Sequence, residues 1–206
     1  MKVLLINGSP HREGCTHTAL AEIAAELQKQ GVESTEFWIG PAPQGGCLGC
    51  GGCAKTGRCV QKDKVNEALE LLGEVDGLIV GTPVHYAAAS GSVTGFLDRL
   101  FYAGSASLRY KPAAAVASAR RAGTTAALDQ LNKYFTFNQM PLVSSQYWNM
   151  VHGTCPDEVR QDAEGLQIMR QLARNMAWML RCIEAGKAAG VPLPETEEKV
   201  RTNFIR

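Results

Sequence analysis

Short apolar runs alternate with longer segments of helical periodicity along most of the chain. Five runs have the length of a buried strand, at residues 3–6, 35–39, 77–80, 113–117 and 141–144. Runs that are apolar at nearly every position are typical of parallel strands covered on both faces. We predict a β-strand at each of the five.

The segments between these strands place apolar residues at helical spacing. They fall near residues 20–31, 65–72, 93–101, 124–137 and 166–183. Each has several apolar positions three or four residues apart, which is the pattern of an amphipathic helix with one buried face. We predict a helix in each segment.

Strands that alternate with helices predict an α/β domain, in which helices cover both faces of a parallel sheet. Five strands favour a doubly wound, three-layer domain with the strand order 2-1-3-4-5. We predict one domain over residues 1–190, with a cysteine-rich loop at residues 40–60 and a C-terminal arm over residues 191–206.

The composition narrows the class of protein. The apolar content of 45% and the net charge of +1 are ordinary for a globular domain and give no sign of a nucleic-acid or membrane partner. No apolar run approaches the ~20 residues that span a bilayer. Residues 1–6 turn polar too early for a signal peptide. We expect a cytoplasmic protein, whose reduced cysteines favour metal, cluster or redox roles over disulfides.

In a doubly wound sheet the ligand binds beyond the carboxyl ends of the strands, in the loops after residues 6, 39, 80, 117 and 145. The first loop matches neither a Walker A sequence nor G-x-G-x-x-G. It offers hydroxyls, backbone N–H groups and cations at the start of a helix, on Ser9, His11, Arg12, Gly14, Thr16 and Thr18. That arrangement suits a terminal phosphate; the alternative is that Thr16 only caps the helix.

Two further loops carry aromatic side chains. Gly81-Thr-Pro-Val-His-Tyr86 places His85 and Tyr86 where they could face a flat heteroaromatic ring, or it is an ordinary turn. The loop at residues 145–152 contains a Tyr-Trp pair, which would roof a substrate pocket or pack at a dimer interface.

Four of the seven cysteines, Cys47, Cys50, Cys53 and Cys59, lie within thirteen residues and are interleaved with glycines. The spacing C-x2-C-x2-C-x5-C suits thiolates that converge on one iron–sulfur cluster. A zinc site is a weaker interpretation, because two Cys-x2-Cys knuckles are usually a dozen or more residues apart. A cysteine-rich loop that packs without any metal is the third alternative.

Three motifs together resemble the NAD(P)H-dependent FMN reductase family of flavodoxin-like proteins: Asn7-Gly-Ser-Pro with Gly14-x-Thr16, Gly81 to Tyr86, and Gly95-Phe-Leu-Asp-Arg99. With the four cysteines, the chain is similar to the iron–sulfur flavoprotein branch of that family. The resemblance implies the flavodoxin-like fold, with a five-stranded parallel sheet. It departs from the family pattern at two positions, where His11 follows Ser-Pro and Cys15 precedes Thr16.

The resemblance also implies a set of cofactor-binding residues. Ser9, His11, Gly14 and Thr16 would hold the phosphate of FMN, with Arg12 as a substitute cation. A second group would lie along the isoalloxazine ring: Thr82, Pro83, Val84, His85 and Tyr86. Apart from the resemblance, the fourth-strand loop, which contains Ser118 and Gly123, adds two cations at the end of the sheet, Arg120 and Arg121. They would neutralise the flavin or grip the phosphates of a nicotinamide cofactor, or they only start a solvated helix.

These observations favour an FMN-dependent NAD(P)H oxidoreductase that reduces a quinone, flavin, azo or nitroaromatic acceptor. His85 or Tyr86 would donate a hydrogen bond or a proton to the acceptor. The alternative is an electron carrier that uses a 4Fe–4S cluster, held by the four cysteines, together with FMN and passes electrons to a redox protein. A bare FMN-binding sensor is a third class. Family precedent suggests a homodimer or homotetramer.

Overall fold

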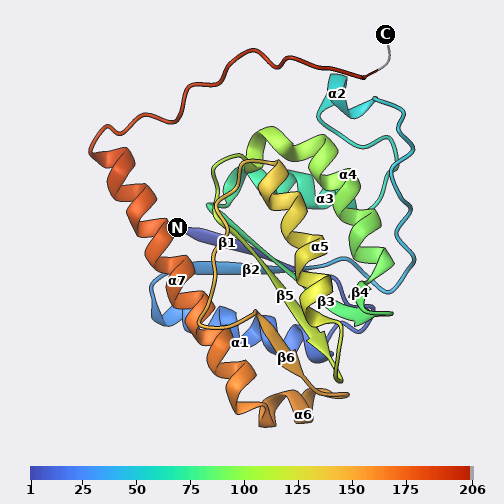
Figure 1. The fold of residues 1–206 in the computed structure, drawn as a ribbon, viewed down its shortest axis with the longest axis vertical. Coiled ribbons are helices and arrows are strands. Elements are labelled where there is room, and N and C mark those ends of the chain that lie inside the picture. Colours follow the sequence, from blue (N-terminus) through green and yellow to red (C-terminus); the bar gives the residue numbers. More distant parts are fainter. Residues whose placement is uncertain (205–206) are drawn as a thin grey trace.

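The computed structural model describes residues 1–204, and it confirms the three-layer α/β fold with a mostly parallel sheet (Figure 1). The parallel strands are β1 (Lys2–Asn7), β2 (Glu33–Trp38), β3 (Gly77–His85), β5 (Ala113–Ala119) and β6 (Met150–His152). Their order is β2-β1-β3-β5-β6, which is the predicted order 2-1-3-4-5 when the parallel strands alone are counted. A short strand, β4 (Ala88–Ala89), pairs antiparallel with the end of β3.

Helices cover both faces of the sheet (Figure 1). One face is covered by α1 (Cys15–Lys29) and α7 (Ala163–Ala188), and the other by α3 (Lys64–Leu71), α4 (Gly91–Leu108) and α5 (Thr124–Phe137). The short elements are α2 (Cys53–Thr56), α6 (Pro156–Gln161) and the 3-10 helix η1 (Leu72–Glu74). The helix predicted at residues 124–137 lies at those same residues.

Alternation along the strands divides the core between the two faces. Leu4 and Ile6 of β1 pack with α3, α4 and α5, while Val3 and Leu5 pack with α1 and α7. All four side chains are at most 1% exposed, because a strand covered on both faces buries every residue. The core therefore fixes the strands firmly and leaves their carboxyl ends to carry the chemistry.

The predicted position of the fifth strand is wrong. Residues 141–144 form only an isolated bridge, between Leu142 and the first residue of β5, and the paired strand is Met150–His152. Pro141 has no N–H to continue a ladder, so the chain leaves the sheet and returns to the far end of β5. The loop beyond this strand therefore follows His152 and is not the segment at residues 145–152.

The third strand is longer than predicted. β3 continues from Gly77 to His85, and residues 81–85, which we expected in a loop, belong to the strand and to its hairpin with β4. Pairing with β5 continues through Pro83 and Ser118. Because this pairing is between distant segments, the local sequence gives no signal of it.

The segment from Val191 to Phe204 contains no helix or strand and extends away from the end of α7 (Figure 1). One contact brings it back to the domain, where the Lys199 ammonium lies 5.5 Å from the ring centroid of Phe137 on α5. A role for this segment as an oligomer contact remains a prediction. Within residues 1–204, no helix has both the length and the apolar character to cross a membrane.

Candidate functional site

The loop between β1 and α1 is held in shape by Asn7, which is fully buried. Its side-chain amide donates to the carbonyl of Arg12 at 3.0 Å and to the carboxylate of Glu36 at 2.8 Å, and its oxygen accepts from the N–H of Ser9 at 3.1 Å. A side chain that uses three hydrogen bonds across one loop fixes the path of the backbone. No role was predicted for Asn7 from the sequence.

Ser9 also shapes the loop rather than pointing freely out of it. Its hydroxyl accepts from the N–H of His11 at 3.1 Å, and its carbonyl accepts from the indole of Trp38 at 2.7 Å. The Arg12 guanidinium lies 5.7 Å from the centroid of the same Trp38 ring. His11 and Arg12 are both exposed, so two side chains that can carry positive charge border a rigid turn.

The N-terminus of α1 has unused hydrogen-bonding capacity. Gly14 is the cap residue, no side chain caps the helix, and its first turn contains no acidic residue. The backbone N–H groups of Thr16 and His17 donate to no acceptor within residues 1–204. The Thr18 hydroxyl turns back to the Gly14 carbonyl at 3.2 Å. The open N–H groups and the helix dipole together favour an anion at this place.

Thr16 and Ser118 link this helix to the sheet. Their hydroxyls are 2.8 Å apart, and both residues are buried. Ser118 lies in register with Pro83 of β3, so this contact brings the first, third and fourth predicted loops together. Each hydroxyl can both donate and accept, so the pair retains capacity for a further partner.

The β3–β4 hairpin ends in an unusual turn. Tyr86 and Ala87 both have positive φ, of 50° and 58°, although turns of this kind strongly favour Asn and Gly. Tyr86 is fully exposed at the tip, and Gly123 packs below it, where an added Cβ would lie 2.6 Å from the Cα of Ala87. Strained turns of this kind are concentrated at functional sites.

The remaining residues of this hairpin divide into internal and accessible groups. The Thr82 hydroxyl is buried and is used internally, donating to the Pro83 carbonyl at 2.9 Å and accepting from the Ser90 N–H at 3.1 Å. Pro83 and Val84 are half-buried, and His85 is exposed. The hairpin therefore presents the apolar side chains of Pro83 and Val84 and the imidazole of His85 at the edge of the sheet.

Cations lie near these loops without acidic partners. Arg120 directly follows β5, is exposed, and forms no ion pair with any residue in the range 1–204.

Cys15, at the start of α1, is a packing residue. Burial first, and then the neighbouring Cys155, raise the pKa of its thiol. A raised pKa disfavours the thiolate, which is the nucleophilic form of cysteine.

The four cysteines of the run surround one pocket of about 520 Å³, which Arg99 and Tyr102 of α4 also line. All four thiols are free. Gly49 and Gly51 have φ of 63° and 67°, which explains why glycine alternates with cysteine here. Four thiols around one pocket are the donor set of an iron–sulfur cluster. Within residues 1–204, however, no three Cys, His, Asp or Glu side chains lie close enough to hold a metal ion.

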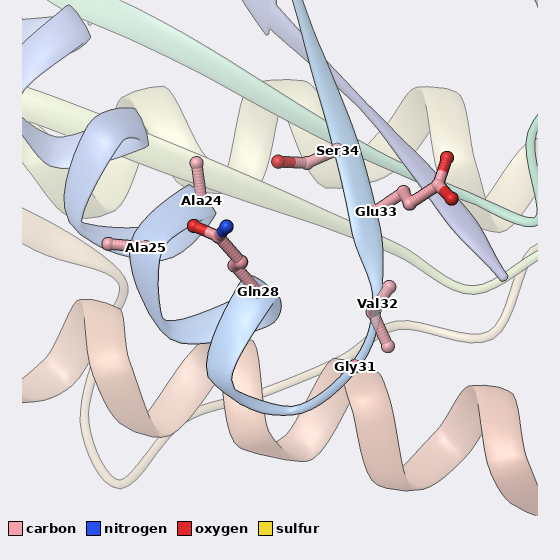
Figure 2. A pocket seen from close by; sticks show the side chains of 7 residues that line it. All are labelled: Ala24, Ala25, Gln28, Gly31, Val32, Glu33 and Ser34. Carbon is pink, nitrogen blue, oxygen red and sulfur yellow. The ribbon is translucent and has the colours of Figure 1, made fainter.

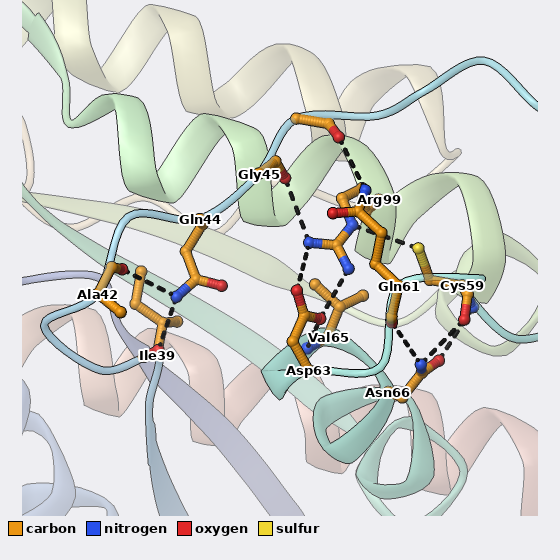
Figure 3. Close-up of polar contacts among 11 residues, drawn as sticks. Ile39, Ala42, Gln44, Gly45, Cys59, Gln61, Asp63, Val65, Asn66 and Arg99 are labelled. Carbon is orange, nitrogen blue, oxygen red and sulfur yellow. Dashed lines mark hydrogen bonds and ion pairs between the residues drawn. The ribbon is translucent and has the colours of Figure 1, made fainter.

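One of the four cysteines is fixed by buried polar groups (Figure 3). The guanidinium of Arg99, which is 1% exposed, donates to the sulfur of Cys59 at 3.2 Å and to both carboxylate oxygens of Asp63. Burial would raise the pKa of Asp63, but hydrogen bonds from Arg99 and from the Val65 N–H hold that pKa below its usual range. The sequence feature that indicates this contact is Arg99, a charged residue on the otherwise apolar buried face of α4.

A larger groove of about 700 Å³ lies between the end of α1 and the start of β2 (Figure 2). It sits at the amino ends of the strands, away from the loops described above. Glu33 is its one ionisable lining residue. The carboxyl edge of the sheet and the cysteine pocket are therefore the candidate functional sites.

Comparison with known proteins identifies the family of this chain. Residues 1–154 match the model of the family described as NADPH-dependent FMN reductase. An iron–sulfur flavoprotein of Archaeoglobus fulgidus is 33% identical over 196 residues, covering 91% of this chain and 96% of the relative. An iron–sulfur flavoprotein of Methanocaldococcus jannaschii is 28% identical over 192 residues, covering 89% and 100%.

Among solved structures, an archaeal flavodoxin superposes with a TM-score of 0.60 at 15% identity, covering 88% of this chain and 99% of the flavodoxin. At that identity the likeness concerns the fold, and it confirms the flavodoxin-like architecture. The match to the family model extends over β1 to β6, including the loop between β1 and α1, the cysteine run and the β3–β4 hairpin. The chain therefore belongs to the NADPH-dependent FMN reductase family, alongside relatives named iron–sulfur flavoproteins.

Proposed function

We propose that this protein is an FMN-dependent oxidoreductase that takes electrons from NAD(P)H and passes them to a small oxidised acceptor, such as a quinone, a free flavin, or an azo or nitroaromatic compound. The observation that carries the proposal is the uncapped N-terminus of α1 at Gly14, in a chain of the FMN reductase family. An open helix N-terminus at the carboxyl edge of such a sheet suits the FMN phosphate.

The phosphate loop would bind the dianion mainly through its backbone. The N–H groups of Thr16 and His17 are open, and the Thr16 hydroxyl can turn to a phosphate oxygen while it keeps its contact with Ser118. His11 and Arg12 stand exposed beside them and would add charge. The rigid turn around Ser9 means that little ordering is needed when the ligand binds.

The β3–β4 hairpin would hold the ring system. Pro83 and Val84 are half-buried apolar residues, and Gly123 lets the turn at Ala87 approach closely. FMN, when bound, supplies the electron-transfer chemistry, and the protein contributes binding, orientation and electrostatics. Arg120 lies beyond β5 and would place a positive charge near the ring or a nicotinamide donor.

His85 and Tyr86 are the candidates for contact with the acceptor, because both are exposed at the hairpin. Either could donate a hydrogen bond or a proton to an acceptor oxygen or nitrogen. The strained backbone at Tyr86 holds its side chain outward, which suits a contact that forms only with a bound substrate.

The test is anaerobic reduction of the FMN-loaded protein by NADH or NADPH, followed by addition of a quinone. We expect the flavin absorbance to disappear with one of the nucleotides and to return with the quinone. The double variant His85→Ala/Tyr86→Phe should keep its FMN and lose acceptor turnover. Wild-type turnover in that variant would remove both residues from the mechanism, and failure of both nucleotides would remove the NAD(P)H-dependent activity.

A second function is favoured by the pocket that all four cysteines line. We propose that Cys47, Cys50, Cys53 and Cys59 hold a 4Fe–4S cluster and that the protein also carries electrons to or from a redox protein. The relatives named iron–sulfur flavoproteins support this. Iron and acid-labile sulfide in anaerobically purified protein test it. About four irons per chain are expected, and their absence after reconstitution would contradict it.

We further propose that the protein acts in the cytoplasm as a homodimer or homotetramer. Tyr147 and Trp148 are both more than half exposed and pack edge to face, 4.7 Å apart, so they offer an aromatic contact to a second copy. Sedimentation of the wild type and of a Tyr147→Ser/Trp148→Ser variant tests this. The variant should dissociate, and an unchanged assembly would assign the contact elsewhere.

A further inference from the structure

We propose that Arg99 positions Cys59 and sets the redox potential of the cluster in the cysteine pocket. The inference rests on the proposed 4Fe–4S cluster. Arg99 does not belong to the set of thiol ligands. It would act through Cys59, which makes it a positioning residue.

The first argument is the geometry of the guanidinium. Nε donates to the Cys59 sulfur at 3.2 Å, while Nη1 and Nη2 donate to the two oxygens of Asp63 at 2.8 and 2.7 Å. Nη1 also donates to the carbonyl of Gly45 at 3.2 Å. A planar fork held at three places has one orientation, so Nε must point at the sulfur. Figure 3 shows this arrangement.

The second argument is that the backbone of Cys59 is fixed as well. Its N–H donates to the Asn66 side-chain oxygen at 2.9 Å, and its carbonyl accepts from the Asn66 amide at 3.0 Å. Asn66 is 8% exposed and lies on α3, while Arg99 lies on α4. Cys59 is therefore held from two helices at once.

The other three cysteines lack such support. Cys47 accepts from the backbone N–H of Gly49, two residues away, at 3.4 Å, and the Cys53 thiol donates weakly to the Tyr102 carbonyl at 3.8 Å. Cys50 is exposed. These three lie in a glycine-rich segment that can close around an incoming cluster. Cys59 is then the fixed ligand against which the others assemble, and Arg99 is what fixes its sulfur.

The third argument concerns charge. A cluster with thiolate ligands gains negative charge on reduction, and hydrogen bonds to its sulfurs raise the reduction potential. The buried Arg99 supplies both a hydrogen bond and a positive charge at one ligand, in a place where water screens poorly. Asp63 cancels part of that charge. The two residues should therefore shift the potential in opposite directions.

The experiment compares reconstituted wild-type protein with Arg99→Gln, Arg99→Lys and Asp63→Asn. The measurements are iron and sulfide per chain, the rate of iron loss to a chelator, and the midpoint potential from a titration followed by electron paramagnetic resonance. Arg174→Gln is the control, because Arg174 also pairs with a carboxylate, that of Glu26, but lies on α7, which covers the face of the sheet opposite α4. FMN content in every variant reports whether the domain is folded.

We expect Arg99→Gln to lose iron about 10- to 100-fold faster than wild type, as is typical when a supporting partner of a metal ligand is removed. Its midpoint potential should become more negative. Asp63→Asn should move the potential the other way, because it leaves the arginine charge uncompensated. Arg99→Lys should have a midpoint potential between those of Arg99→Gln and wild type, because the lysine ammonium keeps the positive charge. It should still lose iron faster than wild type, because an ammonium lacks the planar, forked set of N–H donors. Arg174→Gln should match wild type.

Two results would overturn the inference, and they are distinguishable. If the wild type binds four irons and Arg99→Gln matches it in iron retention and midpoint potential, Arg99 neither positions Cys59 nor sets the potential, although the proposed cluster is present. If Arg99→Gln and Asp63→Asn shift the potential in the same direction, the effect is one of packing and not of charge. Wild type without iron or sulfide, even after reconstitution, would remove the cluster and this inference together.

Discussion

The hydroxyls of Thr16 and Ser118 meet at 2.8 Å, although 102 positions separate them in the sequence. Thr16 lies in the first turn of α1 and Ser118 is the next-to-last residue of β5, so this contact sets the helix N-terminus against the sheet. Both residues are at most 4% exposed. The loop between β1 and α1 is thereby held on one side by Asn7 and on the other by the hydroxyl pair.

We predict that Thr16→Val and Ser118→Ala each weaken FMN binding about tenfold, which corresponds to about 1.4 kcal/mol. The two changes remove the same hydrogen bond, so the double variant should lose less than the sum of the two effects. Fluorescence titration of the apoprotein with FMN measures this. Thr136→Val is the control, since its hydroxyl contacts only carbonyls of its own helix. Full additivity in the double variant would show that the two hydroxyls act separately.

A second prediction concerns the turn at Ala87, where φ is +58°. Glycine adopts this conformation without the steric cost that an L-residue meets, so Ala87→Gly should stabilise the protein by about 0.5–1 kcal/mol. Ala25→Gly, at an exposed position of α1, should instead destabilise it by about 1 kcal/mol. Urea unfolding of both variants measures the change in the free energy of unfolding, which should have opposite signs in the two variants. A destabilised Ala87→Gly would show that the methyl group contributes more than the strain costs.

A third prediction follows from Glu26, which is 3% exposed and accepts from Arg174 at 2.7 Å. The hydrogen bond from Arg174 lowers the pKa of this carboxyl, against the effect of burial. A lowered folded-state pKa gives stability that is present above the ordinary value of about 4.3 and is lost as the pH falls through the folded value. Arg174→Gln should therefore destabilise the protein by about 1 kcal/mol at pH 7 and by less at pH 3.

Urea unfolding at the two pH values checks this sign. The wild type should lose more stability on acidification than the variant does, because only the wild type gives up the bond to Arg174. Equal losses of stability in the two proteins would mean that the ion pair between Glu26 and Arg174 contributes nothing to the free energy of unfolding.

A fourth prediction separates the cysteines of the run from the others. Cys59→Ser should remove most of the iron from reconstituted protein, while Cys182→Ser, at an exposed position of α7, should retain it. Iron and sulfide analysis after desalting makes the comparison. Equal iron in both variants would place the metal outside the pocket.

How much the sequence predicts depends on whether the signal is local. The helix at Thr124–Phe137 was predicted at its observed residues, since its periodicity is regular and Gly123, with φ of +96°, marks its start. The fifth strand was misplaced, because what defines it is the pairing of Ala117 with Met150, a contact between distant segments. The apolar run at residues 141–144 looked more like a strand than Met150–His152 does.

The same distinction holds for the candidate sites. The four cysteines were found from their spacing alone, and the structure brings them around one pocket. The contact from Arg99 to Cys59 spans 40 positions between α4 and the cysteine run, so no spacing rule reveals it. The hydroxyl of Thr82, a residue predicted beside the flavin, bonds to the Pro83 carbonyl and the Ser90 N–H. Its binding role, like those of the other proposed flavin contacts, stays a prediction.

The most direct test of the account is the affinity of the apoprotein for FMN compared with riboflavin, which lacks only the phosphate. If the loop from Asn7 to Gly14 and the N-terminus of α1 form the phosphate site, FMN should bind about 100-fold more tightly, a difference of about 2.7 kcal/mol. Equal affinity for the two flavins would contradict the placement of the phosphate and with it the proposed site.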